Sequence, residues 1–229
     1  MSGPVEIDAD NDNVLDWILV DTLPPNTEAP APIAGTPGDD LFEGVPDGAA
    51  IDGGAGRDTV VYPWSRAEVA HGLEPDGTIV LTGPDERADT LTDIERVTLS
   101  DGVLVFDAGE SGAAVHRLYA AALGRLPKEE GLLHWAEAAD ARGLAHVAGR
   151  FVESAEFEAR IGGSDDPGDV VTALFDTVLG RAPGEEGLAH WTGRAETLGL
   201  DGLLMAFAGS PENRATTAAD TEDGIWVLG

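Results

Sequence analysis

Residues 35–43, GTPGDDLFE, and residues 53–61, GGAGRDTVV, share one pattern of glycines followed by an aspartate at the sixth position. The two aspartates are Asp40 and Asp58, eighteen residues apart. Glycine permits left-handed backbone angles and a close approach of main-chain carbonyls to a hard cation, to which aspartate adds a carboxylate. The alternative interpretation is a pair of ordinary turns, in which glycine and aspartate are common.

Both segments resemble the nonapeptide GGxGxDxUx (U apolar) that binds calcium in RTX proteins. The resemblance implies a parallel β-roll with two nonapeptides per turn, which holds calcium between loops eighteen residues apart. The intervening nonapeptide, GVPDGAAID from Gly44, lacks the sixth-position aspartate. We therefore expect one calcium site, made by the Asp40 and Asp58 side chains, by Asp39, and by main-chain carbonyls near Gly35, Pro37, Gly53 and Ala55.

A second acidic segment precedes these repeats. Its carboxylates lie at relative positions one, three, five and nine: Asp8, Asp10, Asp12 and Asp16. This is the spacing of an EF-hand-like calcium loop, but Asn13 replaces the usual glycine and Leu19 the usual bidentate glutamate. The segment is thus either a second calcium site or a solvated acidic terminus.

The charge of the chain restricts its partners. Its 229 residues carry 43 acidic and 13 basic side chains, a net charge of -30, so we expect it to bind neither nucleic acid nor anionic lipid. No apolar run reaches the roughly 20 residues of a membrane span, which argues against membrane insertion. The chain has no cysteine, so disulfides and thiolate metal sites are excluded. Divalent cations would relieve the self-repulsion and could promote self-assembly.

No basic and then apolar leader follows Met1. The RTX resemblance implies a type I secretion-like route instead, in which the exporter reads a C-terminal signal. Residues 220–229, DTEDGIWVLG, are the candidate signal. Extracellular calcium modules have dissociation constants of about 0.1 to 1 mM, so such a site stays empty in a cytosol and fills outside. We therefore expect an extracellular or cell-surface protein.

A β-rich region follows the calcium repeats. Residues 1–34 form an acidic arm that ends in a proline-rich linker, and residues 35–110 comprise the β-roll and short alternating apolar runs with turns at 74–77 and 100–102. The run DTLTDIERVTLSDGVLVFD, from Asp89, resembles the β segment that often follows calcium repeats in secreted RTX proteins. A single coil turn cannot bury a core alone, so we expect this segment to supply its neighbour.

The second half is an internal duplication with helical periodicity, over residues 111–219. Residues 113–161 align with 170–217 at an offset of 56, with about 18 identities in the 44 pairs from Leu118. The shared frame, LGRxPxEEGLxHW, resembles a domain of unknown function found in tandem in bacterial RTX and surface-layer-type proteins, and more distantly phycobilisome linker domains. The predicted fold class is therefore α+β.

Each copy contains a His-Trp pair, His134 with Trp135 and His190 with Trp191. The tryptophans lie at helical spacing from apolar residues, which favours a core position. The alternative is two sugar-binding platforms, on which the indole faces stack on sugars. Two weak sites on one chain would gain affinity for a polymer by multivalency.

The sequence has no HExxH, GxSxG or P-loop motif and no candidate thiol nucleophile, so we expect no enzyme. A glycosidase-like pair of acids is the least favoured interpretation, since spacing cannot identify it. We expect a calcium-binding structural or adhesive protein of an extracellular matrix or surface layer. The alternative is a carbohydrate-binding module for capsule or exopolysaccharide. The expected partners are calcium, surface polysaccharide and other surface proteins.

Overall fold

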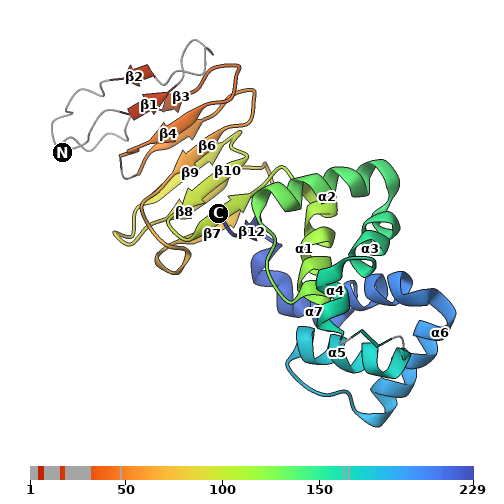
Figure 1. Cartoon of the computed structure of the whole chain (residues 1–229). Coiled ribbons are helices and arrows are strands. Elements are labelled where there is room, and N and C mark those ends of the chain that lie inside the picture. Colours follow the sequence, from red (N-terminus) through yellow and green to blue (C-terminus); the bar gives the residue numbers. More distant parts are fainter. Residues whose placement is uncertain (1–4, 8–15, 19–31, 47, 162, 165) are drawn as a thin grey trace. The chain divides into compact units, whose positions relative to one another are not determined.

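The computed structural model describes residues 5–7, 16–18, 32–46, 48–161, 163–164 and 166–229 (Figure 1). The protein is a mixed α+β chain that divides into two compact units. The first comprises residues 1–107 with 228–229, and the second comprises residues 108–227. The α+β class predicted from the sequence is confirmed.

The first unit is built from short strands in two sheets. One sheet has, within this unit, the order β11-β10-β6-β4-β1-β2, and the other has the order β3-β5-β9-β8-β7. The elements are β1 (Val5–Ile7), β2 (Asp16–Ile18), β3 (Ile33–Ala34), β4 (Leu41–Glu43), β5 (Ala50–Asp52), β6 (Thr59–Val61), η1 (Arg66–Glu68), β7 (Ala70–Leu73), β8 (Ile79–Thr82), β9 (Ala88–Thr92), β10 (Arg96–Leu99) and β11 (Gly102–Val105).

Parallel pairing follows the eighteen-residue repeat. β4 pairs with β6 with Phe42 opposite Val60, and β3 pairs with β5 with Ile33 opposite Ile51. β10 then pairs in parallel with β6, and β9 pairs in parallel with β5. The segment after the repeats thus supplies a further parallel strand to each sheet.

Buried apolar residues run across these strands. Phe42, Val60 and Val97 are neighbours in one sheet and are fully buried. Ile51 and Leu91 are neighbours in the other sheet and are buried to within 2%. Burying one such side chain stabilises the fold by about 1.5 to 3 kcal/mol, so these rows form the core of the first unit.

Antiparallel pairs complete the first unit, among them β1 with β2 and β8 with β9. β7 pairs with β8 around the turn at residues 74–77, and β10 pairs with β11 around the turn at residues 100–101. Gly77 in the first turn has a φ of 92°, which explains the glycine at that position. The β7–β8 and β10–β11 hairpins were predicted from the turn residues and alternating apolar runs.

The second unit contains all seven α-helices of the described residues. They are α1 (Gly109–Leu123), α2 (Glu129–Arg142), α3 (Leu144–Val152), α4 (Ala155–Arg160), α5 (Pro167–Leu179), α6 (Glu185–Ala208) and α7 (Pro211–Thr217), followed by η2 (Ala218–Asp220) and strand β12 (Ile225–Val227). The residues of β12 are at most 5% exposed, and the strand packs against α1.

The duplication is visible in the helices. At an offset of 56 residues, α1 corresponds to α5, α4 corresponds to α7, and α2 with α3 corresponds to α6. Gly143 separates α2 from α3 at φ 85°, and Gly199 interrupts α6 at φ 73°. The same backbone break therefore occurs in both copies, at a glycine each time.

Helix starts agree with the sequence at two positions and differ at two. The Ser154 and Ser210 hydroxyls accept hydrogen bonds from Phe157 N and Asn213 N, as N-caps do. Proline suits the first turn of a helix, but Pro127 and Pro183 instead precede it. The residues after them are extended, with ψ 157° and 165°, and serve as the N-caps of α2 and α6.

None of the helices in the described residues has both the length and the apolar character needed to span a membrane.

Candidate metal centre and candidate ligand pockets

The two glycine-rich loops stack on one another; the first connects β3 to β4 and the second connects β5 to β6. A side chain added at Gly54 would meet the Thr36 carbonyl oxygen, and one added at Gly56 would meet the Gly38 carbonyl oxygen. Both glycines have positive φ, 88° and 139°. The eighteen-residue register therefore continues from the strands through the loops, and it brings backbone against backbone where only glycine fits.

Asp40 and Asp58 lie side by side in this stack, 2% and 0% exposed. The Asp40 amide donates a 2.8 Å hydrogen bond to Asp58 Oδ1. Asp40 Oδ2 accepts a 2.6 Å bond from Thr36 N, and the Thr36 hydroxyl lies 3.1 Å from the same oxygen. The Asp40 carboxylate is thus held by donors of its own loop.

Asp58 is held less completely. In the second loop Gly54 replaces Thr36, and the Gly54 amide donates to Asp52 Oδ1. Asp58 Oδ2 is buried and has no hydrogen-bond partner among the residues that the structure describes. Burial raises the pKa of the Asp58 carboxyl to about 6; the hydrogen bond from the Asp40 amide opposes this rise, and the charges of Glu95, Asp40 and Asp39 add to it. A bound cation would both give Asp58 Oδ2 a partner and favour the ionised form of the carboxyl.

Main-chain and carboxylate oxygens lie close together at two successive positions of the stack. A side chain at Gly35 would collide with the Gly53 carbonyl oxygen and Asp40 Oδ2. One at Gly53 would collide with the Asp93 carbonyl oxygen and Asp58 Oδ2. Carboxylates and main-chain carbonyls are the ligands that calcium prefers, so the donor chemistry fits this ion.

The other predicted ligands are more peripheral. Pro37, Ala55 and Asp39 are exposed, and Asp39 Oδ1 accepts a 2.9 Å hydrogen bond from Arg57 N of the next loop. Asp8, Asp10 and Asp12 lie outside the described residues, and Asp16 begins strand β2. Within the described ranges, no group of three or more acidic or histidine side chains is arranged to hold a metal, so a site here depends on main-chain oxygens.

Glu95 extends the stack in a way that the sequence reasoning missed. Glu95 Oε2 accepts a 2.7 Å hydrogen bond from Asp58 N, as Asp58 Oδ1 does from Asp40 N. The connection from β9 to β10 lacks the glycine pattern, so the motif gave no signal. One signal was available: Asp40, Asp58 and Glu95 each immediately precede a parallel strand.

Asp89 is another buried acid of the first unit that the sequence analysis did not identify. Its carboxylate is 2% exposed and accepts hydrogen bonds from Ala49 N at 2.8 Å and from the Tyr62 hydroxyl at 2.6 Å. Burial, together with the Asp89 carboxylate, raises the pKa of Tyr62. This acid has protein donors on both oxygens, unlike Asp58, and is therefore explained structurally.

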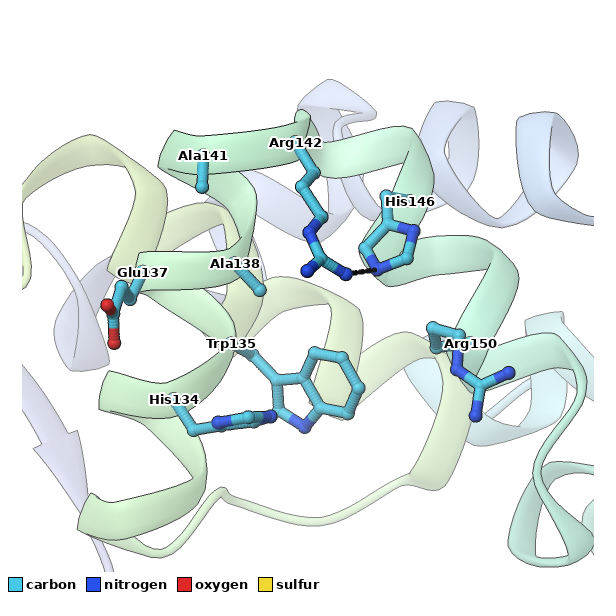
Figure 2. A pocket seen from close by; sticks show the side chains of 8 residues that line it. All are labelled: His134, Trp135, Glu137, Ala138, Ala141, Arg142, His146 and Arg150. Atoms are coloured by element: carbon cyan, nitrogen blue, oxygen red, sulfur yellow. Dashed lines mark hydrogen bonds between the residues drawn. The ribbon is translucent and has the colours of Figure 1, made fainter.

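The two tryptophans border separate pockets in the second unit, and only Trp135 is joined there by its neighbouring histidine. In the first copy, a pocket of about 450 Å³ is bordered by His134, Trp135, Arg142, His146 and Arg150 (Figure 2). Trp135 is half-buried, with its ring 5.4 Å from that of Phe151 in an edge-on arrangement. The tryptophan is thus part core and part pocket wall.

The pocket of the second copy has a different character. It has a volume of about 620 Å³ and is bordered by Trp191, Phe175 and Arg181 together with three acids, Glu185, Glu186 and Glu212. Trp191 is half-buried and packs 4.9 Å from Phe207. His190 is exposed and does not border this pocket.

Comparison with known families gives one match. Residues 148–217 match "Domain of unknown function (DUF4214)", which covers α5 to α7 and the end of the first copy. The predicted resemblance to a helical domain of unknown function is confirmed for this segment. No curated protein matches the chain.

Proposed function

We propose that this chain is a secreted or surface-associated calcium-binding protein with a structural or adhesive role. Its first unit would be a calcium-binding parallel β-roll of the RTX type. The observation that carries the proposal is Asp58 Oδ2, a buried carboxylate oxygen that lies beside a second buried carboxylate and has no hydrogen-bond partner in the described part of the chain.

Calcium would be held by Asp40, Asp58 and main-chain oxygens of the two glycine loops. When bound, it supplies positive charge to a corner where Asp58, Asp40 and Glu95 lie together. A chain with a net charge of -30 repels itself, and an ion bound only by the folded state stabilises that state. Folding would therefore be coupled to the calcium concentration outside the cell, after a type I secretion-like export.

The test is a thermal melt of the full chain in calcium and in chelator, with Asp58→Asn as the variant. We expect calcium, more than magnesium, to raise the melting temperature of the wild type, and Asp58→Asn to abolish most of the rise. Asp76→Asn is the matched control, since Asp76 is an exposed acid in the β7–β8 turn. An equal melting temperature with and without calcium would refute the proposal.

Light scattering against calcium concentration tests the structural role. A structural or adhesive component that assembles through calcium should increase in mass as calcium is added and return on chelation. A monomer at every calcium concentration would limit the role of the ion to folding.

A second candidate function is carbohydrate binding by the helical copies. It is favoured by one observation: both Trp135 and Trp191 are half-buried and border pockets, so each indole keeps an accessible edge or face. A glycan array on the wild type, Trp135→Ala and Trp191→Ala would test it. Neither function requires catalysis, and we propose no enzymatic activity.

A further inference from the structure

The pocket of the first helical copy is bordered by two arginines on a strongly acidic protein. Arg142 and Arg150, two of the chain's 13 basic residues, border it together with His134 and His146. Glu137, the one acid among the described residues that border it, is directed away from Arg142 and His146 (Figure 2). Such a pocket attracts anions, whereas the chain as a whole repels them.

Arg142 is available to a ligand. It forms no ion pair within the described part of the chain, and its guanidinium lies 3.4 Å from His146 Nε2. Arg150 is paired with Glu153 at 2.6 Å, but both side chains are more than half exposed. An arginine presents five donors in a planar fork, so either guanidinium can bind a carboxylate through two hydrogen bonds.

An aromatic wall accompanies the positive charge. His134 and Trp135 meet edge to face with ring centres 4.9 Å apart, and both border the pocket. The side chains of Arg142 and His146 meet over the same pocket as the indole in Figure 2. An aromatic surface suits the apolar face of a sugar ring, and the volume of about 450 Å³ lies within the roughly 300 to 1,000 Å³ of ligand pockets.

The duplication shows that these basic residues are not needed to build the helical fold. Arg142, His146 and Arg150 align at the offset of 56 with Leu198, Gly202 and Ala206, while the His-Trp pair is kept. The second copy forms the same helices and the same aromatic contacts without them. The positive charge of the first pocket is therefore separable from folding.

We propose that this pocket binds a carboxylated sugar, such as a uronic acid unit of an acidic polysaccharide. Arg142 and Arg150 would bind the carboxylate, His146 would position Arg142, and Trp135 with His134 would contact the ring. The inference rests on the carbohydrate-binding alternative given above and makes the ligand class specific. It does not depend on the calcium site.

The test is calorimetric titration of the full chain with trigalacturonate, with the neutral galactotriose and with triglutamate. We expect trigalacturonate to bind at least about tenfold more tightly than either other probe, because charge-assisted hydrogen bonds and ring contact act together. Added salt should weaken its binding. Equal affinity for galactotriose would show that the carboxylate is not recognised. Equal affinity for triglutamate would show that the sugar ring is not recognised. Either result would overturn the proposal.

The variant Arg142→Leu/Arg150→Ala introduces the residues of the second copy. We expect it to weaken trigalacturonate binding about tenfold or more while the melting temperature stays close to that of the wild type. The matched control is Arg87→Ala, which removes an exposed arginine between β8 and β9 that borders neither tryptophan pocket, and should leave the affinity unchanged. Unchanged affinity in the double variant would overturn the proposal.

Calcium can also bridge two carboxylates, so the titrations are made in calcium and in chelator. Binding that disappears in chelator but survives Arg142→Leu/Arg150→Ala would assign the sugar to a calcium bridge and overturn the pocket. The calcium melts of the previous section are independent of this result. Binding of neutral glycans that Trp191→Ala or Trp135→Ala abolishes would support the broader carbohydrate function even if the acid-specific inference fails.

Discussion

The glycine loops and the helical copies are both repeats, but they use repetition differently. In the loops, one copy lies on the other, and Asp40 N bonds directly to Asp58 Oδ1. In the helices, each copy makes its own aromatic cluster, with Phe151 at the centre of one and Phe207 at the centre of the other. A site between copies requires both, whereas a core within each copy leaves the surfaces free to differ.

The largest expected effect tests whether the two aromatic clusters are equivalent. Phe151 and Phe207 are 4% and 1% exposed. Phe151→Ala and Phe207→Ala should each lower the free energy of unfolding by about 3 to 5 kcal/mol, because each leaves a cavity beside a tryptophan. Urea unfolding followed by circular dichroism measures this. Leu198→Ala, at a side chain 43% exposed, is the control, with an effect below about 0.5 kcal/mol.

A loss for Phe207→Ala only would break the comparison. It would mean that one helical copy carries the stability of the second unit while the other is secondary to it.

The next effect concerns the close approach of the loops. Gly53→Ala should destabilise the first unit by about 3 kcal/mol or more, because the new methyl group would meet the Asp93 carbonyl oxygen, which cannot rotate away. Gly72→Ala is the matched control, since no atom of the described residues lies within 4 Å of a methyl group there. If both variants unfold at the same urea concentration, the loops are not packed as described.

Asp58 gives a smaller effect that depends on pH. The pKa of its carboxyl is about 6 in the folded chain against an ordinary value of 3.8, so ionisation opposes folding without calcium. The free energy of unfolding is therefore highest below about pH 4, where this carboxyl is protonated in both states. It falls as the pH rises through 6, and this group contributes at most about 3 kcal/mol to the fall.

Asp58→Asn should remove that part of the pH dependence in chelator, as measured by urea unfolding at pH values on both sides of 6. The same variant should also lose the calcium response, because both effects arise from one carboxylate. A pH dependence equal to that of the wild type would mean that Asp58 is accommodated by the protein alone, as Asp89 is.

The smallest effect compares the ion pairs that the helical copies share. Arg125 pairs with Glu156 at 2.6 Å, and Arg181 pairs with Glu212, with all four side chains about half exposed. Double-mutant cycles should give about 0.2 to 1 kcal/mol for each pair, and similar values for both, since water and salt screen them equally. A coupling free energy several times larger in one copy would show that the two ion pairs have different surroundings.

Much of the architecture could be predicted from the sequence, for identifiable reasons. The hairpins follow from Asp76-Gly77 and Asp101-Gly102, whose turn preferences are local. The parallel register follows from the eighteen-residue spacing of Asp40 and Asp58, and the helical duplication follows from eighteen shared identities. These signals lie in short stretches or in repeats, so no tertiary information was needed.

The candidate sites were less predictable because their partners are distant in sequence. Glu95 bonds to Asp58 across 37 residues and Asp89 bonds to Ala49 across 40, with an inserted hairpin between. The basic border of the first pocket comes from the end of α2 and from α3, which only the backbone break at Gly143 brings together. No periodicity of the sequence marks such contacts.

The burial of β12 limits when the C-terminal tail can be recognised by another protein. Residues 225–227 are packed against α1 once the second unit has folded, so a receptor can read this part of the tail only in the unfolded chain. If the tail carries the export signal, folding after export would bury part of that signal. The exporter could then no longer recognise the folded protein, and folding would make export irreversible.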